Sequence, residues 1–132
     1  MSHTWRWIDI FDIRAIHNAQ IARHGGLDGV RDRGLIESAL ARPRNLAAYG
    51  DPDAADLTAT YAFGIAHNHG FLDGNKRTAW VAARVFLADN GFNLVFDQIE
   101  GYQLMMSVAA GTTDEASVAA WFRDRIRPLA SR

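Results

Sequence analysis

Two histidines, two asparagines, an aspartate, a lysine and an arginine lie within eleven residues of this sequence. The stretch HNHGFLDGNKR runs from His67 to Arg77. Side chains of these types can bind a metal ion, take part in nucleic-acid cleavage or hold a phosphate group. Their spacing and the local structure decide among these three kinds of chemistry.

A metal site made by the two histidines is disfavoured by their spacing. Residues two apart on a helix do not face each other, and zinc would need further nitrogen, oxygen or sulfur ligands. The letters H-N-H also suggest a nuclease, but such sites place these residues on separate elements of a ββα unit. Here they are adjacent on a helical background. We therefore expect His67 to be a structural or surface residue.

The turn after the histidines fits a phosphate site better. Asp73-Gly74-Asn75 leads directly into a predicted helix, whose first turn leaves backbone N–H groups unpaired at the positive end of the helix dipole. Gly74 allows a close backbone approach or a positive φ, so this turn can form a nest for an anion. Lys76 and Arg77 add two cations beside it.

Two further side chains give this phosphate site a possible chemistry. His69 ends the preceding helix, and a histidine side chain is the usual residue to take a proton from an attacking hydroxyl. Asp73 supplies a hard oxygen suited to Mg²⁺, which normally accompanies nucleotide phosphates. We expect Phe71 to lie in the core and fix the turn. Without His69 and Arg77, DGNK would be an ordinary capped turn.

The elements that must position these residues are predicted to be helices. Apolar residues recur at three- and four-residue spacing along most of the chain. The first four predicted helices span about residues 8–23, 35–41, 54–68 and 75–89. Two more follow the pairs Asp97/Glu100 and Thr112/Glu115, each of which is typical of a capping box, and the first of these two reaches about residue 110.

Glycine and proline mark the predicted helix ends. Gly25-Gly26 ends the first helix, Pro43 ends the second, and Gly70 ends the third. Residues 27–34 and 43–53 are expected to be loops, and residues 92–96 are a short, extended piece at most. Strand signals are almost absent, so we expect an all-α fold, a compact single-domain bundle of about six helices.

Composition narrows the class of protein. The 132 residues fit one domain, and 48% are hydrophobic, enough to bury a core. There is no cysteine, no signal peptide and no apolar run of ~20 residues, so we expect a cytoplasmic protein that contacts no membrane. With 14 basic and 15 acidic residues the net charge is −1, which argues against direct nucleic-acid binding. Arg123, Arg125 and Arg127 are expected to form a solvated last helical turn.

Residues His69 to Arg77 resemble the signature of the Fic/Doc superfamily, HxFx(D/E)GN(G/K)R. The chain is most similar to the death-on-curing (Doc) branch, the toxins of type II toxin–antitoxin systems. The likeness extends over most of Ile16 to Asn90, in the segments IHNAQIARHGG, GVRDRGLIESALARP and YAFGIAHNHGFLDGNKRTAW. The resemblance implies a small helical bundle, as does the helical pattern.

The resemblance also implies transfer of part of a nucleotide to a protein hydroxyl. The wider Fic group usually transfers AMP, and it carries glycine where this chain has Lys76 and a second arginine where it has Trp80. Both departures point away from AMP transfer. The Doc branch implies instead that the γ-phosphate of ATP goes to a threonine of elongation factor Tu, which halts translation. Transfer of AMP or another nucleotidyl group remains the alternative.

The resemblance assigns a role to each residue of the motif. His69 would be the base that acts on the target hydroxyl, and Asp73 would hold Mg²⁺ or orient the site. Lys76 and Arg77 would counter the charge that develops during transfer. The residues expected to cradle the phosphates are Gly74, Asn75, Lys76 and Arg77. The implied cofactors are ATP and Mg²⁺.

One residue departs from the family inside the motif. Gly70 stands where proline is usual, and we expect glycine to loosen the turn and reduce its preorganisation. Gly70 is also the one local feature that favours a third hypothesis, a degenerate toxin that only binds its antitoxin and regulates transcription with it.

The resemblance finally implies a partner. Many Fic enzymes carry an inhibitory helix with the motif (S/T)xxxE(G/N), but the residue four positions before Glu100-Gly101 is Phe96. We therefore expect a separate antitoxin whose disordered tail folds as a helix into a groove of the toxin. The charged loop from Asp28 to Arg33 is either a flap over the site or an ordinary solvated loop.

Overall fold

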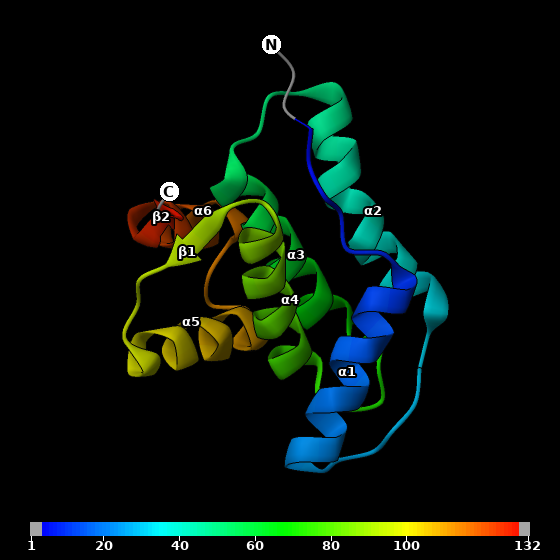
Figure 1. The fold of residues 1–132 in the computed structure, drawn as a ribbon. Helices are drawn as coiled ribbons and strands as arrows, with labels where there is room; N and C mark the ends of the chain where they lie inside the picture. The colour runs from blue at the N-terminus through cyan, green and yellow to red at the C-terminus, as the bar shows by residue number, and fades with distance from the viewer. Residues whose placement is uncertain (1–3, 130–132) are drawn as a thin grey trace.

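The computed structural model describes residues 4–129, which form six helices and one small sheet (Figure 1). This confirms the predicted all-α bundle of about six helices. None of these helices has the length and apolar character that crossing a membrane requires. In chain order the elements are α1 (Ile10–His24), α2 (Arg33–Tyr49), α3 (Ala54–Asn68), α4 (Asn75–Asp89), β1 (Phe92–Leu94), α5 (Gln98–Ala110), α6 (Glu115–Arg125) and β2 (Ile126–Pro128).

Helix α3 lies at the centre of the bundle. Eleven of its 15 residues are buried, and it contacts α2, α4, α5 and α6 (Figure 1). Its sequence is apolar on nearly all sides, as is typical of a buried helix. Gly64 allows α2 to approach, because a Cβ there would lie 3.4 Å from the Cβ of Ala39. The motif that follows α3 is thus attached to the most enclosed helix of the molecule.

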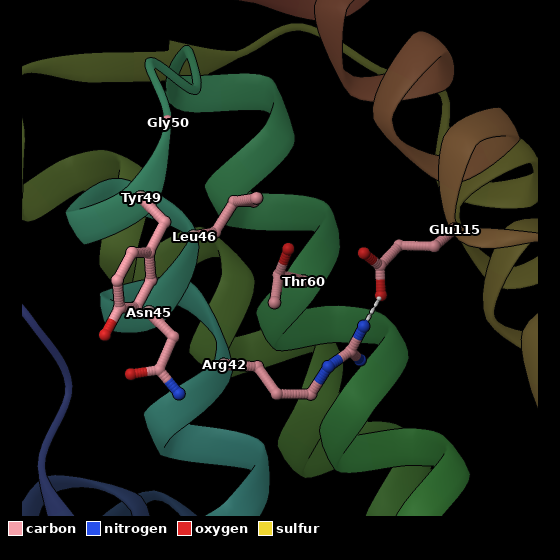
Figure 2. Close-up of a pocket in the computed structure, with 7 residues that line it drawn as sticks. All are labelled: Arg42, Asn45, Leu46, Tyr49, Gly50, Thr60 and Glu115. Atoms are coloured by element: carbon pink, nitrogen blue, oxygen red, sulfur yellow. Dashed lines mark hydrogen bonds and ion pairs between the residues drawn. The ribbon is translucent and has the colours of Figure 1, made fainter.

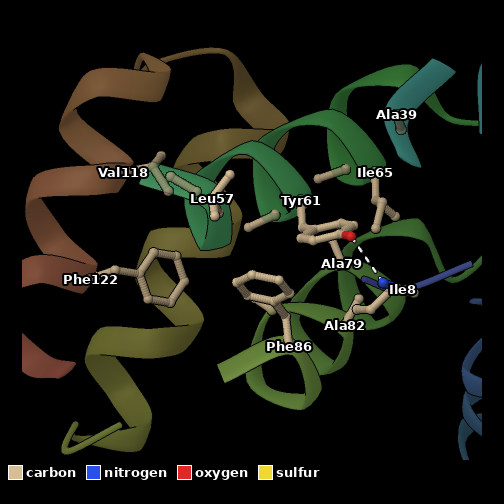
Figure 3. Packing of buried hydrophobic residues seen from close by; sticks show 14 of the residues in the cluster. Ile8, Ala39, Leu57, Tyr61, Ile65, Ala79, Ala82, Phe86, Val118 and Phe122 are labelled. Carbon is tan, nitrogen blue, oxygen red and sulfur yellow. Dashed lines mark hydrogen bonds between the residues drawn. The ribbon is translucent and has the colours of Figure 1, made fainter. Parts of the chain in front are cut away.

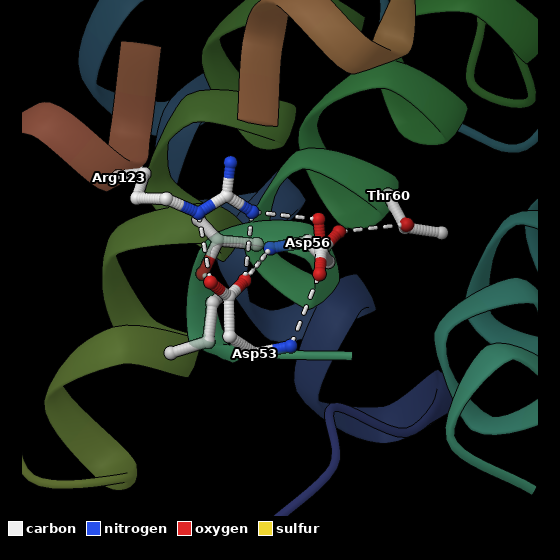
Figure 4. A network of polar contacts seen from close by, with 6 residues as sticks. Asp53, Asp56, Thr60 and Arg123 are labelled. Carbon is white, nitrogen blue, oxygen red and sulfur yellow. Dashed lines mark hydrogen bonds and ion pairs between the residues drawn. The ribbon is translucent and has the colours of Figure 1, made fainter. Parts of the chain in front are cut away.

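The start of α3 is held by a polar network (Figure 4). Asp53 caps the helix and forms a reciprocal capping box with Asp56. Arg123 on α6 donates to both carboxylate oxygens of Asp53, at 2.8 and 3.0 Å, and to Asp56 at 2.8 Å. Hydrogen bonds from Arg123 are the main reason that the pKa of Asp53 falls from 3.8 to about 2. Arg123 therefore joins α6 to α3 and is more than a solvated cation in a last helical turn.

The apolar core packs around α3 and α4 (Figure 3). The rings of Tyr61 and Phe86 have centroids 5.1 Å apart. The hydroxyl of Tyr61 accepts a hydrogen bond from the backbone N–H of Ile8 at 3.0 Å, and burial raises the pKa of Tyr61 to about 12. This bond fixes the segment before α1 against the core.

The predicted end of the second helix is wrong. We predicted a helix over residues 35–41 that ends before Pro43, but α2 continues through this proline to Tyr49. A proline inside a helix removes a backbone hydrogen bond and costs about 3 kcal/mol. Pro43 and Leu40 are both buried on α2, which packs along α3. The packing of α2 against α3 therefore outweighs the tendency of proline to end a helix.

The C-terminal part differs from prediction in two details. The sixth helix is capped by Asp114, whose carboxylate accepts from the N–H of Ser117 at 2.8 Å, and not by Thr112. The chain then forms β2, which sequence patterning did not predict. It pairs antiparallel with β1, the short extended piece, with Asn93 opposite Arg127. A three-residue strand carries too little alternation to be recognised.

Candidate active site

The predicted site residues lie on the turn between α3 and α4 and on the first turn of α4. His69 ends α3 in the left-handed region, with φ of 52° and ψ of 47°. Within residues 4–129 it is the one residue other than glycine with a positive φ. Such a conformation is strained for a residue with a side chain, so the surroundings must hold it. The imidazole of His69 is exposed and makes no hydrogen bond within the described part of the chain.

Gly70 is held tightly, against the expectation that it loosens the turn. It is buried, and a Cβ there would overlap Cγ1 of Ile36 and come within 3.3 Å of backbone atoms of α2 and its cap. Its carbonyl oxygen accepts from the N–H groups of Arg31 and Asp32 at 2.8 and 2.9 Å. Glycine at this position permits a close approach between the motif and the start of α2.

Phe71 lies in the core, as predicted, and it does so against a histidine that sequence reasoning did not assign. Phe71 is 3% exposed, and its ring stacks on that of His17, with centroids 3.8 Å apart and planes within 7°. His17 is 1% exposed. Its place four residues after buried Ile13 on α1 is the signal that could have indicated its inward direction.

His17 also contacts the motif backbone. Its Nε2 lies 2.8 Å from the carbonyl oxygen of Asp73. Because a carbonyl can only accept, Nε2 must carry the proton. The ring also lies 3.8 Å from where a Cβ on Gly74 would be. His17 thus supports the turn at Asp73 and Gly74, the two residues that lead into α4.

Asn75 uses its side chain to close the turn. Its amide donates to the carbonyl oxygen of Phe71 at 3.0 Å and accepts from the N–H of Phe71 at 3.1 Å. The side chain is buried and leaves little capacity for a ligand. If Asn75 binds a phosphate as expected, it is therefore the backbone N–H of Asn75, and not its side chain, that is available to do so.

The N-terminus of α4 differs from those of the other helices. Each of the other five is capped by an aspartate side chain, whereas the N-cap residue of α4 is Gly74, which lies in the left-handed region and has no side chain to cap the helix. Within residues 4–129, the backbone N–H groups of Asn75, Lys76 and Arg77 have no hydrogen-bond partner. Three adjacent free N–H groups at a helix start form a site for an anion.

Two cations stand beside these N–H groups. Lys76 and Arg77 are exposed and occupy the first turn of α4, which contains no acidic residue. Lys76 Nζ lies 3.3 Å from the sulfur of Met106 on α5, and neither cation has a carboxylate partner within the described residues. Cations at the positive end of a helix are unfavourable by about 0.3–1 kcal/mol each. A bound anion would relieve this repulsion.

Asp73 stands at the edge of the same turn. Its carboxylate accepts from its neighbour Gly74 N–H at 3.0 Å and from Leu27 N–H at 3.2 Å. The side chain is exposed, so further lone pairs can face a ligand. Residues 4–129 contain no group of three His, Asp or Glu side chains that could form a complete metal site. One carboxylate nevertheless fits Mg²⁺ that arrives with nucleotide phosphates.

The charged loop before α2 lies against the motif. Val30 forms a β-bridge with Phe71, and the N–H of Leu72 donates to the carbonyl oxygen of Gly29 at 3.1 Å. The guanidinium of Arg31 donates from Nε to the carbonyl oxygen of His69 at 2.7 Å. These bonds decide against an ordinary solvated loop. The segment is joined to the turn that carries His69.

Two other residues of the sequence argument lie away from this cluster. His67 is exposed, and its ring stacks on Phe63 at 5.2 Å, which confirms a surface residue. Trp80 occupies the position of the second Fic arginine. Its ring packs against Phe96 at 5.1 Å and against Trp121 at 6.1 Å. This position is filled by an aromatic cluster and offers no cation to a phosphate.

A surface pocket of about 390 Å³ lies between α2, α3 and α6 (Figure 2). Arg42 and Glu115 form an ion pair of 2.6 Å in its wall. None of its lining residues belongs to the motif or to the loop before α2, so it is separate from the candidate active site. The lining residues are Arg42, Asn45, Leu46, Tyr49, Gly50, Thr60 and Glu115.

Comparison with known proteins agrees with this geometry. Residues 7–87 match the model of the Fic/DOC family, and the chain belongs to that family. It is 39% identical over 119 residues to protein kinase doc of Escherichia phage P1, over 89% of this chain and 94% of the relative. It is 44% identical over 101 residues to toxin Doc of Mycolicibacterium smegmatis, over 73% of this chain and 77% of the relative. Both relatives carry the name Doc, so the resemblance seen in the motif is confirmed.

Proposed function

We propose that this chain is a toxin of a type II toxin–antitoxin system and acts as a protein kinase. It transfers the γ-phosphate of ATP to a serine or threonine hydroxyl of a translation protein. The observation that carries this proposal is the uncapped start of α4, where three N–H groups without a partner in residues 4–129 and the cations Lys76 and Arg77 follow exposed His69 in the chain. The names of the relatives, protein kinase doc and toxin Doc, support the same activity.

Phosphate binding falls to the first turn of α4. Its free N–H groups donate to phosphate oxygens, and Lys76 and Arg77 supply positive charge that no carboxylate of residues 4–129 neutralises. Both cations also counter the charge that builds up as the γ-phosphoryl group leaves ADP. Asp73 would hold Mg²⁺, which when bound neutralises phosphate charge. Loss of helix capping at this one position is consistent with an anion taking the place of the cap.

His69 is the proposed base. Its imidazole takes the proton of the target hydroxyl as the hydroxyl oxygen forms a bond to the γ-phosphorus. The bond between the γ-phosphorus and the bridging oxygen of the β-phosphate breaks, and ADP leaves. The exposed imidazole, free of hydrogen bonds within the described residues, is available to a protein substrate. A backbone conformation fixed by the neighbouring loop keeps it in place.

Nucleotidyl transfer is the second candidate. It would use the same His69 but attack the α-phosphorus. Two observations weigh against it: Lys76 occupies the position where AMP-transferring enzymes have glycine, and Trp80 with its aromatic neighbours occupies the position of their second arginine. A chain that only binds its antitoxin is the third candidate, and the tight packing of Gly70 removes its one local support.

The proposed target is elongation factor Tu, and the proposed regulator is an antitoxin whose tail folds as a helix into a groove of the toxin. The proposed site of action is the cytoplasm, where translation takes place. No direct contact with nucleic acid is proposed.

Intact mass spectrometry of elongation factor Tu tests the proposal. The factor is incubated with this protein, ATP and Mg²⁺, and with the His69→Ala variant as the control. A phosphate-sized gain that the variant does not produce is expected. A nucleotide-sized gain would establish the second candidate. If the factor gains nothing, the proposed target is wrong.

A further inference from the structure

We propose that Arg31 is a positioning residue that holds His69 in the geometry required for proton transfer. This inference rests on the proposed function of His69 and adds a residue outside the motif. Arg31 donates from Nε to the carbonyl oxygen of His69 at 2.7 Å and from Nη2 to that of Asn68 at 3.2 Å. One guanidinium therefore binds the last carbonyl of α3 and the next one along the chain.

The end of α3 requires such a partner. The last carbonyls of a helix have no partner within it, and the negative end of its dipole favours a cation. Helices often solve this with glycine in the left-handed position, but here His69 occupies it, with φ of 52°. Arg31 supplies both the donors and the charge, so it stabilises the strained conformation that directs the His69 side chain.

The backbone of Arg31 is itself anchored. Its N–H donates to the carbonyl oxygen of Gly70 at 2.8 Å, and that of Asp32 donates to the same oxygen at 2.9 Å. Asp32 in turn caps α2 through the N–H of Leu35 at 3.1 Å. The guanidinium thus projects from a fixed point at the start of α2 onto the end of α3. Gly70, which has no Cβ to separate the two segments, permits this approach.

Arg31 acts through His69 and not on the phosphate. Two of its nitrogens, Nε and Nη2, are engaged with backbone carbonyls. It lies on the loop before α2, whereas the proposed phosphate cradle is the start of α4. Removal of Arg31 is therefore expected to change the rate of transfer and to leave the affinity for ATP unchanged. Lysine cannot replace it fully, because a single ammonium lacks the planar fork that reaches two carbonyls.

Neighbouring Arg33 provides a matched control. It is an exposed arginine at the start of α2 that pairs with Glu37 at 2.7 Å, and within the described residues its side chain forms no hydrogen bond or ion pair with the motif. Arg33→Ala should leave both the rate of transfer and ATP binding at wild-type levels. Arg31→Ala should lower kcat on the order of 100-fold, which is the effect expected when a catalytic group is displaced by about 1 Å.

The experiment combines kinetics with a measurement that needs no catalysis. Phosphate transfer is measured for wild type, Arg31→Ala, Arg31→Lys and Arg33→Ala, and ATP affinity by calorimetry. Proton NMR reports the backbone conformation of His69, because a positive φ brings the amide and α protons of the same residue close together. This gives a strong nuclear Overhauser effect (NOE) between them. In Arg31→Ala we expect this NOE of His69 to weaken and kcat to fall, while the affinity for ATP stays unchanged. We expect Arg31→Lys to fall between wild type and Arg31→Ala, and added guanidinium ion to restore part of the rate of Arg31→Ala.

The outcomes separate this inference from the proposed function. If wild type transfers phosphate and Arg31→Ala matches Arg33→Ala in rate and in the His69 signal, the positioning role is wrong. If wild type transfers no phosphate to any protein, the proposed function fails, and the NMR signal alone decides whether Arg31 holds His69. If Arg31→Ala does not fold, the soluble Arg31→Lys variant decides: a wild-type rate and signal there would overturn the proposal.

Discussion

His17 on α1 donates a hydrogen bond to the carbonyl oxygen of Asp73, 56 residues further along the chain, at 2.8 Å. It is one of several groups that bind the backbone of the motif. The carbonyl oxygens of Asn68, His69, Gly70, Phe71 and Asp73 each accept a hydrogen bond from a side chain or from the loop before α2. The candidate site is therefore held through its main chain, which leaves its exposed side chains available for substrate.

His17→Phe is expected to keep the stack on Phe71 and to lose the bond to Asp73. A carbonyl left without its donor costs about 1–3 kcal/mol, and the start of α4 should become less ordered. Affinity for ATP with Mg²⁺ should fall, because Asp73 and Gly74 lead into the phosphate cradle. Isothermal titration calorimetry measures this, with urea unfolding as the check on stability. Unchanged stability and affinity would show that the hydrogen bond does not support the turn.

Gly70→Ala is expected to destabilise the protein by about 1–3 kcal/mol, since the added Cβ would overlap Ile36 in a packed interior. Gly70→Pro, which restores the usual family residue, should be at least as harmful. Urea unfolding measures both. In an Ile36→Ala background the cost of Gly70→Ala should shrink, because the clashing atom is gone. An equal cost in both backgrounds would mean that the space around Ile36 is not the cause.

Lys76→Met should weaken phosphate binding while it preserves the length and most of the packing of the side chain. Phosphate and ATP are expected to raise the melting temperature of wild type, because they bind the folded state only, and the rise should shrink with added salt. Thermal unfolding with and without ligand measures this. Lys76→Gly should also lower phosphate transfer. A melting temperature that ATP raises equally in Lys76→Met would exclude Lys76 from the site.

The lowered pKa of Asp53 predicts that the stability of the protein falls at acidic pH. This pKa is lowered from 3.8 to about 2, chiefly by hydrogen bonds from Arg123. Because the folded state holds fewer protons than the unfolded state between these values, the stabilisation is complete above about pH 4 and is lost as the pH falls to about 2. Asp53→Asn keeps an N-cap but loses the charge. The difference in the free energy of unfolding between wild type and Asp53→Asn should therefore shrink as the pH falls from about 4 to about 2. Urea unfolding at each pH measures it. A constant difference would contradict the pairing.

Local sequence patterns predicted much of this architecture. The bounds of α3 and α4, and the turn between them, follow from helical periodicity and from the glycines that interrupt it. Pro43 misled the prediction, because a local helix breaker is overridden by packing on α3, which no local pattern contains. The strand β2 was missed because its partner β1 is more than 30 residues away in the sequence.

In the candidate site, too, local features could be predicted from the sequence and long-range contacts could not. The motif residues could be named from their types and order, and so could the burial of Phe71. The supports of the motif could not, because His17 and Arg31 bind it from 37 or more residues away in the sequence. The second role of Asn75 was also hidden: an amide that closes a turn and one that binds a ligand look alike in sequence.

The most direct test of the central claim follows the phosphorus atom of ATP. A whole-cell extract is incubated with the protein and with ATP labelled at either the γ- or the α-phosphorus, and the label in protein is measured. The proposed kinase should transfer γ-label and no α-label, and His69→Ala should abolish the transfer. Transfer of α-label would contradict the kinase and establish nucleotidyl transfer, and γ-label that persists in His69→Ala would contradict the role of His69 as the base.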